Sequence, residues 1–320
     1  MMDVKFGLVS PQEKVDEKIK MFERASITGE LTLNPPSIER IFLAIDSHIE
    51  ASEISETAIQ ITVALAMRFK AEVYIACIAP SPEELSISER LTNKSVKLLE
   101  SLKVSVIGGC SIGRPSEHIL ELSEQFNPSL IVMPIPYGER SETFDIESLG
   151  STVDLIIRKS PYPILFVRKL KFNPKDITKN ILVILDKLEH LRGAEFALTL
   201  AEKGSTIKLL SITEKEKVET AKVLAQTIID SKIGSGVLEN AHKLEIQPLI
   251  SVMVDEGKTR GVNIERTYRL GNRVKLILNE LKHKHTIIVS STSLGRDNIL
   301  DSEVENLVRF SKIPVLIVKS

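Results

Sequence analysis

A unit of strand, loop, helix and strand occurs twice in this chain of 320 residues. The first copy runs from Ser129 to Arg168 and the second from Thr286 to Lys319. Both copies close on a nearly all-apolar strand, Pro163–Val167 and Pro314–Val318. A unit that recurs at this distance predicts two similarly folded halves, and the length is also typical of about two domains.

Before each copy, short apolar runs alternate with segments of helical periodicity. In the first half, Ala51, Ile54, Ala58, Ile61 and Leu65 are spaced by three and four residues and predict one apolar helix face. Strands of continuous apolar sequence that are separated by helices predict a parallel sheet covered on both faces. The strands predicted for the first half are 41–46, 73–78, 104–107, 130–133 and 163–167, with helices between them, one of them at Ser88–Leu102.

The same plan divides the chain into segments. We expect an N-terminal helical extension (1–36), a first domain (37–168), a linker (169–178) and a second domain (179–320). Ser10-Pro11-Gln12-Glu13 predicts a helix start, continued to Arg24, and Leu31–Leu33 is predicted as a short strand. The second domain has an enlarged helical insertion at 213–261, with helical segments predicted at Val218–Ile233 and at Val237–Asp255, the latter kinked by Pro248.

Composition excludes several classes of function. The formal net charge is −1, so the chain has no general attraction for nucleic acid, and Trp is absent. Cys77 and Cys110 lie in apolar sequence and are expected to be reduced core residues. No apolar run approaches the roughly 20 residues that span a bilayer, and the N-terminus lacks a signal-peptide pattern. We expect a cytoplasmic protein without direct membrane insertion.

Together these features resemble the universal stress protein family in its tandem form. The resemblance is carried by an Asp that ends the first strand of each half (Asp46 and Asp186), the Gly-x-Pro turn Gly113–Pro115, and Gly150-Ser151 before the last helix. It implies two flavodoxin-like, adenine nucleotide α-hydrolase-like domains, each with five parallel strands. Members that bind nucleotide hold ATP or AMP at the carboxyl ends of the strands, where open sheets generally bind ligands.

The phosphate loop of such members is incomplete in the first half. The family pattern is Gly, two residues, Gly, nine residues, then Gly with Ser or Thr. Pro134 and Tyr137 stand at the two early glycine positions, and twelve residues lead from there to Gly150-Ser151. Pro134 has no N–H to donate, and Tyr137 restricts the backbone. Gly138 substitutes for the missing glycine if the register shifts by one.

The second half departs further. Ser291 and Leu294 take the glycine positions, and Asp301-Ser302 begins the last helix. The Asp301 carboxylate, with Glu303 beside it, opposes a bound phosphate. We expect this site to be degenerate.

From the resemblance we assign candidate roles in the first half. Asp46 and the backbone near Ala44 and Ile78 would face adenosine, and the phosphates would face Gly138, Gly150, Ser151 and Thr152. Helix starts suit phosphate because their N–H groups lack partners and carry partial positive charge. Two structural interpretations remain open: Asp46 as a cap of the next helix, and Gly150-Ser151 as a plain helix start.

Other motifs carry no chemistry. Gly257-Lys258-Thr259 imitates the end of a P-loop without its upstream glycine and is interpreted as chance. His283 and His285 are flanked by lysines, which disfavours a metal cation and favours a solvated helix end. We predict no metal site and no catalytic set of residues.

Three functions follow as hypotheses. The first is a non-catalytic stress-response or regulatory protein that binds ATP or AMP in the first half. The second is an interaction module without nucleotide, for example a soluble regulatory partner of a membrane transporter. An ATP-hydrolysing enzyme is the third, but only Asp46 offers a candidate base. The two closing strands are expected to pair edge to edge as an internal pseudo-dimer, with a further homodimer left open.

Overall fold

The computed structural model describes residues 31–46, 52–137, 149–214, 235–281, 283–292 and 302–319. Its secondary structure belongs to one compact unit, Leu33–Ser320. The first half (residues 37–168) contains these elements: β1 (Arg40–Ile45), α2 (Ser52–Phe69), β2 (Glu72–Ala79), α3 (Pro82–Ser101), β3 (Val106–Ile112), α4 (Pro115–Phe126), β4 (Leu130–Pro134), α5 (Ser151–Lys159) and β5 (Ile164–Val167).

The second half (residues 179–320) has the same order of elements. A short 3₁₀ turn, η2 (Pro174–Asp176), precedes it. Its elements are β6 (Asn180–Ile184), η3 (Leu188–His190), α6 (Leu191–Leu200), β7 (Thr206–Thr213), α8 (Ser235–Arg260), β8 (Asn263–Leu270), α9 (Arg273–Glu280), β9 (Ile287–Thr292), α10 (Ser302–Phe310) and β10 (Val315–Lys319).

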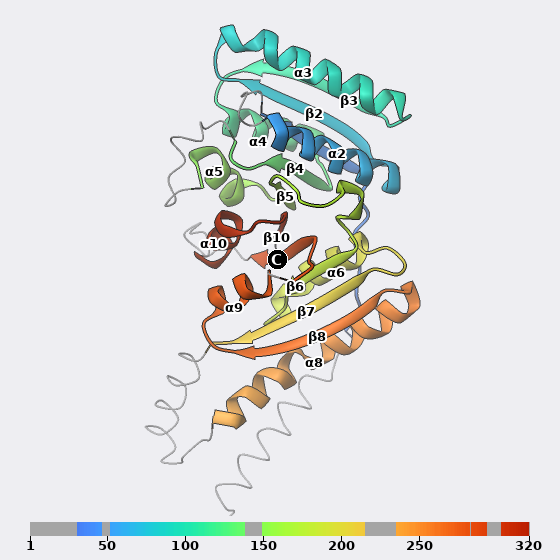
Figure 1. Ribbon diagram of the computed structural model, residues 1–320, viewed down its shortest axis with the longest axis vertical. Coiled ribbons are helices and arrows are strands. Elements are labelled where there is room, and N and C mark those ends of the chain that lie inside the picture. The colour runs from blue at the N-terminus through green and yellow to red at the C-terminus, as the bar shows by residue number, and fades with distance from the viewer. Residues whose placement is uncertain are drawn as a thin grey trace, which may run out of the picture. The chain divides into compact units, whose positions relative to one another are not determined.

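All described strands belong to one ten-stranded sheet, in the order β3-β2-β1-β4-β5-β10-β9-β6-β7-β8 (Figure 1). Neighbouring strands are parallel on either side of its centre, where β5 and β10 run antiparallel. At that junction Leu165 lies opposite Leu316. The two closing strands, each an edge in its own half, therefore cover one another.

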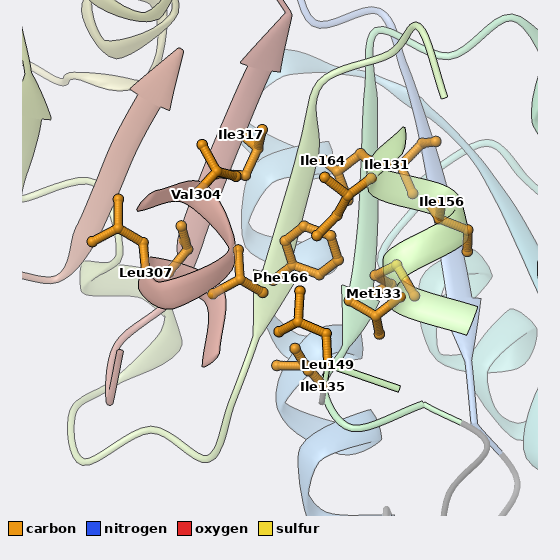
Figure 2. Close-up of a cluster of buried hydrophobic side chains, with 14 of the residues drawn as sticks. Ile131, Met133, Ile135, Leu149, Ile156, Ile164, Phe166, Val304, Leu307 and Ile317 are labelled. Atoms are coloured by element: carbon orange, nitrogen blue, oxygen red, sulfur yellow. The ribbon is translucent and has the colours of Figure 1, made fainter. Parts of the chain in front are cut away.

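The central strands are apolar on both faces because helices cover both sides of the sheet. β4 and β5 are buried along their whole length. Figure 2 shows side chains from the two halves in one cluster: Ile131, Phe166 and Ile156 from the first half pack near Leu307 and Ile317 from the second. The core is continuous across the β5–β10 junction.

Several sequence predictions need correction. Residues 31–39 form no strand, so the prediction of a strand at Leu31–Leu33 is wrong. β3 is Val106–Ile112 rather than 104–107, because its Gly108-Gly109 pair does not look like a strand in the sequence. The helix predicted at Ser88–Leu102 already begins at Pro82, since proline is favoured in the first turn of a helix.

The insertion is only partly described. The predicted helix at Val237–Asp255 lies within α8, which continues through Pro248 to Arg260. The segment Val218–Ile233 and the predicted N-terminal helix from Ser10 to Arg24 lie outside the described residues.

Candidate ligand site at the strand ends

The carboxyl ends of β1, β2 and β4 meet in the first half, where the sequence predicts a ligand site. Asp46 directly follows β1 and is buried, with 4% of its surface exposed. Its backbone carbonyl accepts a hydrogen bond from Ser55 Oγ at 2.9 Å, which ties α2 to the end of β1. Ala44 and Ile78, the other residues expected to face adenosine, are buried in the core.

Tyr137 lies at the same strand ends. Its side chain is 2% exposed, and its hydroxyl donates to the carbonyl oxygen of Ile45 at 2.9 Å. Burial raises the pKa of this phenol well above its usual value. The nearby Cys77 and Asp46 raise the pKa further, while a hydrogen bond from the Ile78 backbone lowers it. The phenol therefore lies between the ends of β1 and β2, beside Asp46.

The chain that carries Tyr137 is fixed where it leaves the sheet. Ile135, just beyond β4, donates its N–H to the carbonyl of Val167 at 2.9 Å. The Ile135 side chain is 1% exposed and belongs to the same hydrophobic cluster as Tyr137. Backbone and side-chain contacts together direct the Tyr137 ring into the interior.

The residues assigned to phosphate begin α5. Gly150 is its N-cap with φ of 84°, a backbone conformation that favours glycine. The Gly150 carbonyl accepts the first helical bond from Asp154 at 3.0 Å. Ser151 is exposed and Thr152 is buried, whereas Gly138 lies outside the described residues. The structure thus places a helix start at Gly150-Ser151. Both interpretations of these residues, as a phosphate site and as a plain helix start, require this feature.

The equivalent position in the second half contains a buried ion pair. Asp186 follows β6, is 4% exposed, and accepts a hydrogen bond from the Ile212 backbone at the end of β7. Its other carboxylate oxygen pairs with Arg273, the first residue of α9. The Asp186 backbone N–H also donates to His190 Nδ1 at 3.1 Å. The corresponding helix start in the first half is Pro115, which carries no charge.

Tyr137 and Arg273 are the residues whose roles the sequence analysis missed. Tyr137 was recognised as replacing a glycine, but nothing in the sequence shows that its ring points inward. Arg273 follows Gly271-Asn272, a turn and helix-cap signal that does not indicate where an arginine side chain reaches. Ser291, placed at the other glycine position, accepts from the Gly193 N–H at 3.0 Å. Asp301 lies outside the described residues.

The P-loop-like segment and the histidine pair noted in the sequence form no ligand site in the described residues. Gly257-Lys258-Thr259 is part of α8 rather than a loop. The prediction that His285 lies on a solvated helix end is wrong. Its side chain is only 8% exposed and lies beside Glu280, which forms a partly buried ion pair with Lys208. Burial lowers the pKa of His285.

Among the described residues, no group of three or more His, Cys, Asp or Glu side chains is arranged to hold a metal ion. No helix among them is long and apolar enough to cross a bilayer.

Residues 37–168 match the universal stress protein family. Three solved structures are similar to the chain over 88% of its length. One is a functionally unknown protein from Pseudomonas aeruginosa PAO1, with TM-score 0.60, 14% identity and 92% of its own chain covered. Another is a putative universal stress protein from Pseudomonas aeruginosa UCBPP-PA14, with TM-score 0.60, 15% identity and 93% of its own chain covered. The third is a universal stress protein from Archaeoglobus fulgidus DSM 4304, with TM-score 0.59, 16% identity and 97% of its own chain covered. At such identities the likeness concerns the fold. No curated protein matches the chain significantly.

Proposed function

We propose that this chain, of which residues 37–168 match the universal stress protein family, is a non-catalytic regulatory protein of the stress response that acts through contacts with partners, without a bound nucleotide. The observation that carries this proposal is the buried Tyr137 ring at the candidate adenosine site. The proposal treats the chain as a tandem pair of domains, 37–168 and 179–320, joined by the linker 169–178.

The pair of domains is proposed to be an internal pseudo-dimer with five strands on each side. The antiparallel contact of β5 with β10 supports this arrangement, because every other contact within the sheet is parallel. The shared order of strands outward from the junction supports it too: β5-β4-β1-β2-β3 on one side, and β10-β9-β6-β7-β8 on the other.

Tyr137 opposes nucleotide binding in the first half. Its hydroxyl already uses the Ile45 carbonyl, and its ring lies beside Asp46 and the Ile78 backbone, the groups expected to face adenosine. A ligand there would have to break this buried hydrogen bond and expel the ring from the core. Removing an aromatic side chain from a core costs on the order of 3–5 kcal/mol in substitution experiments.

In the second half, the Asp186–Arg273 pair opposes binding in a different way. The Asp186 carboxylate already accepts from Ile212 and pairs with Arg273, so an incoming ribose or adenine would compete with a buried charge pair. Breaking such a pair by removing one partner costs about 3–5 kcal/mol.

Adenine nucleotide binding in the first half, as ATP or AMP, is the second candidate. It is favoured by the start of α5, where Gly150 has the positive φ that lets a backbone approach phosphate closely. This candidate requires Tyr137 to leave its site.

Calorimetry distinguishes the two candidates. AMP and ATP are titrated to millimolar concentration into the full chain and into Tyr137→Gly, with Tyr137→Phe as a control that keeps the ring. We expect no binding to the full chain or to Tyr137→Phe, and measurable binding to Tyr137→Gly once thermal melting shows it to be folded. Stoichiometric binding to the unaltered chain would establish the second candidate instead.

A further inference from the structure

We infer that Cys77 and Cys110 form a reversible disulfide between β2 and β3, and that this bond makes the first half a sensor of oxidants. They are the only two cysteines of the chain, and both are free thiols in the structure. β2 and β3 are neighbouring strands at one end of the sheet (Figure 1). The use of the bond as a signal rests on the proposed regulatory function, whereas its formation does not.

The two cysteines are partners in the register of the sheet. β2 and β3 run parallel, and Cys77 lies opposite Cys110. Neighbouring strands are about 4.8 Å apart, and the Cα atoms of a disulfide are usually about 4.4–6.8 Å apart. The two backbones therefore already hold the cysteines within the range of a disulfide.

A second register pair shows how closely side chains approach here. Gly108 lies opposite Ile75, two residues before the cysteine pair on each strand and therefore on the same face of the sheet. A Cβ built on Gly108 would lie 3.8 Å from the Cβ of Ile75. Disulfides join Cβ atoms that are about 3.5–4.5 Å apart. Side chains in this register thus have the separation that a disulfide requires.

The cysteines share the face of the sheet that α3 covers, and they differ in exposure. Cys110 Sγ lies 3.1 Å from Thr92 Oγ1 of α3. Cys77 is fully buried, whereas Cys110 is only half-buried and lies on β3, the last strand at this end of the described sheet. An oxidant therefore reaches Cys110 first, and Cys77 is placed to complete the bond.

A peroxide is the oxidant that this arrangement fits. The Cys110 thiolate attacks one oxygen of hydrogen peroxide, becomes a sulfenic acid and releases hydroxide, which takes up the thiol proton as water. The Cys77 thiol then displaces the sulfenic hydroxyl as a second water, and the S–S bond forms. The two thiols lose two electrons in total, and these electrons reduce the peroxide. A dithiol reverses the reaction by thiol–disulfide exchange.

The surroundings of Cys110 set the speed of the reaction. Burial raises the pKa of its thiol, the hydrogen bond with Thr92 lowers this pKa, and the nearby Glu89 carboxylate raises it further. Thiolate is the reactive form, and little of it is present at neutral pH when the pKa is raised. The pair therefore responds to sustained oxidation rather than to a brief exposure.

Oxidation also changes the contact between β3 and α3. In the reduced chain Cys110 Sγ reaches Thr92 on α3. In the disulfide the same sulfur turns toward Cys77 on β2, so the hydrogen bond with Thr92 is lost. We expect the amides of α3, residues 82–101, to exchange their hydrogens faster in the oxidised chain.

Mass spectrometry of the full chain tests this inference. The folded protein is treated with hydrogen peroxide, its remaining thiols are alkylated after denaturation, and peptide mapping locates any disulfide. We expect a monomer in which Cys77 is bonded to Cys110, and recovery of both thiols with dithiothreitol. Hydrogen exchange of residues 82–101 is compared before and after oxidation.

A shifted cysteine provides the matched control. Gly109→Cys combined with Cys110→Ser moves the thiol by one residue, onto the opposite face of β3. The new Cβ meets only the Tyr74 hydroxyl, at 3.4 Å, so the side chain has room. Once thermal melting shows this variant to be folded, it should form at least tenfold less disulfide with Cys77 than the unaltered chain.

Several results would overturn the inference. Persistence of both thiols after oxidation would do so, as would a disulfide between two copies of the chain or oxidation of Cys110 to sulfinic acid without a bond. Equal bonding in the shifted variant would contradict the role of the register. A bond that leaves the exchange of α3 unchanged would be a disulfide without a switch. None of these measurements involves nucleotide, so failure here is separable from failure of the proposed function.

Discussion

Arg168, directly after β5, and Lys319, the last residue of β10, occupy equivalent positions in the two halves, and each side chain reaches a helix of the opposite half. Arg168 Nη2 donates to the carbonyls of Val308 and Arg309 at 3.0 and 2.8 Å, in the last turn of α10. Lys319 Nζ donates to the carbonyl of Ile157, in the last turns of α5. The final carbonyls of a helix have no partners within it and attract cations, so each half stabilises a helix end in the other.

The stability of the chain should depend on pH through Lys319. Burial lowers the pKa of Lys319 from its usual 10.5 to about 8. Between these values the unfolded chain binds more protons than the folded chain, so the contribution of Lys319 to stability rises as pH increases. Relative to Lys319→Met, the unaltered chain should gain roughly 1–2 kcal/mol in unfolding free energy from pH 7.5 to 10, after allowance for solvent screening.

Urea denaturation at the two pH values measures this difference. Lys171→Met, at an exposed lysine, provides the control and should show no such change relative to the unaltered chain. A difference between the chain and Lys319→Met that stays constant with pH would contradict the assignment.

Adjacent glycines of β3 should respond differently to alanine. Gly108→Ala places a Cβ 2.5 Å from Val96 Cγ2 and 3.0 Å from Thr92 Cγ2, whereas Gly109→Ala meets only the Tyr74 hydroxyl, at 3.4 Å. Overpacking of this kind costs about 1–3 kcal/mol, so Gly108→Ala should be clearly destabilising and Gly109→Ala close to neutral. Thermal melting compares the two.

A second change checks the cause. Val96→Ala makes room for the new methyl group, so Gly108→Ala should cost less in that background than in the unaltered chain. If Gly108→Ala destabilises the chain equally with and without Val96→Ala, the strain does not come from contact with Val96.

The Asp186–Arg273 pair should behave as one unit. Arg273→Met leaves the buried Asp186 carboxylate without its partner and should destabilise the chain by about 3–5 kcal/mol. The double variant Asp186→Asn, Arg273→Met should be less destabilised than the sum of the single changes. An additive double-mutant cycle in urea denaturation would show that the two side chains are not coupled.

An exposed pair supplies the comparison. Lys258 and Asp255 on α8 lie 3.1 Å apart, and both side chains are largely exposed. Lys258→Met should cost less than about 1 kcal/mol.

Tyr137 should be the tyrosine that resists ionisation. The chain has four tyrosines, and burial raises the pKa of Tyr137 well above its usual value. Absorbance at alkaline pH should show one tyrosine that ionises only as the protein unfolds, and Tyr137→Phe should remove that component. A titration of Tyr137→Phe that matches the unaltered chain would contradict the buried position.

The sequence was informative wherever a pattern repeats along the chain. Continuous apolar runs predicted β4 and β5, and the Gly-x-Pro turn predicted the start of α4 at Pro115. The Asp expected at the end of the first strand lies directly after β1 as Asp46. These features depend on local propensity and periodicity, which a single sequence contains.

Features that depend on where a side chain points were not predictable. Tyr137 could have faced solvent in its loop, and only the packed ends of β1 and β2 explain its burial. Arg273 and Asp186 are 87 positions apart by their numbering, and the fold alone brings them together. His285 was misassigned for the same reason, since Lys208 and Glu280 approach it only in the folded chain.

The most direct measurement concerns whether the purified full chain contains a nucleotide. The protein is denatured, and the released small molecules are identified by chromatography and mass spectrometry, with Tyr137→Gly prepared in parallel. If Tyr137 fills the first site and the Asp186–Arg273 pair fills the second, the unaltered chain releases no adenine nucleotide. Release of ATP, ADP or AMP in stoichiometric amount from the unaltered chain would contradict this account.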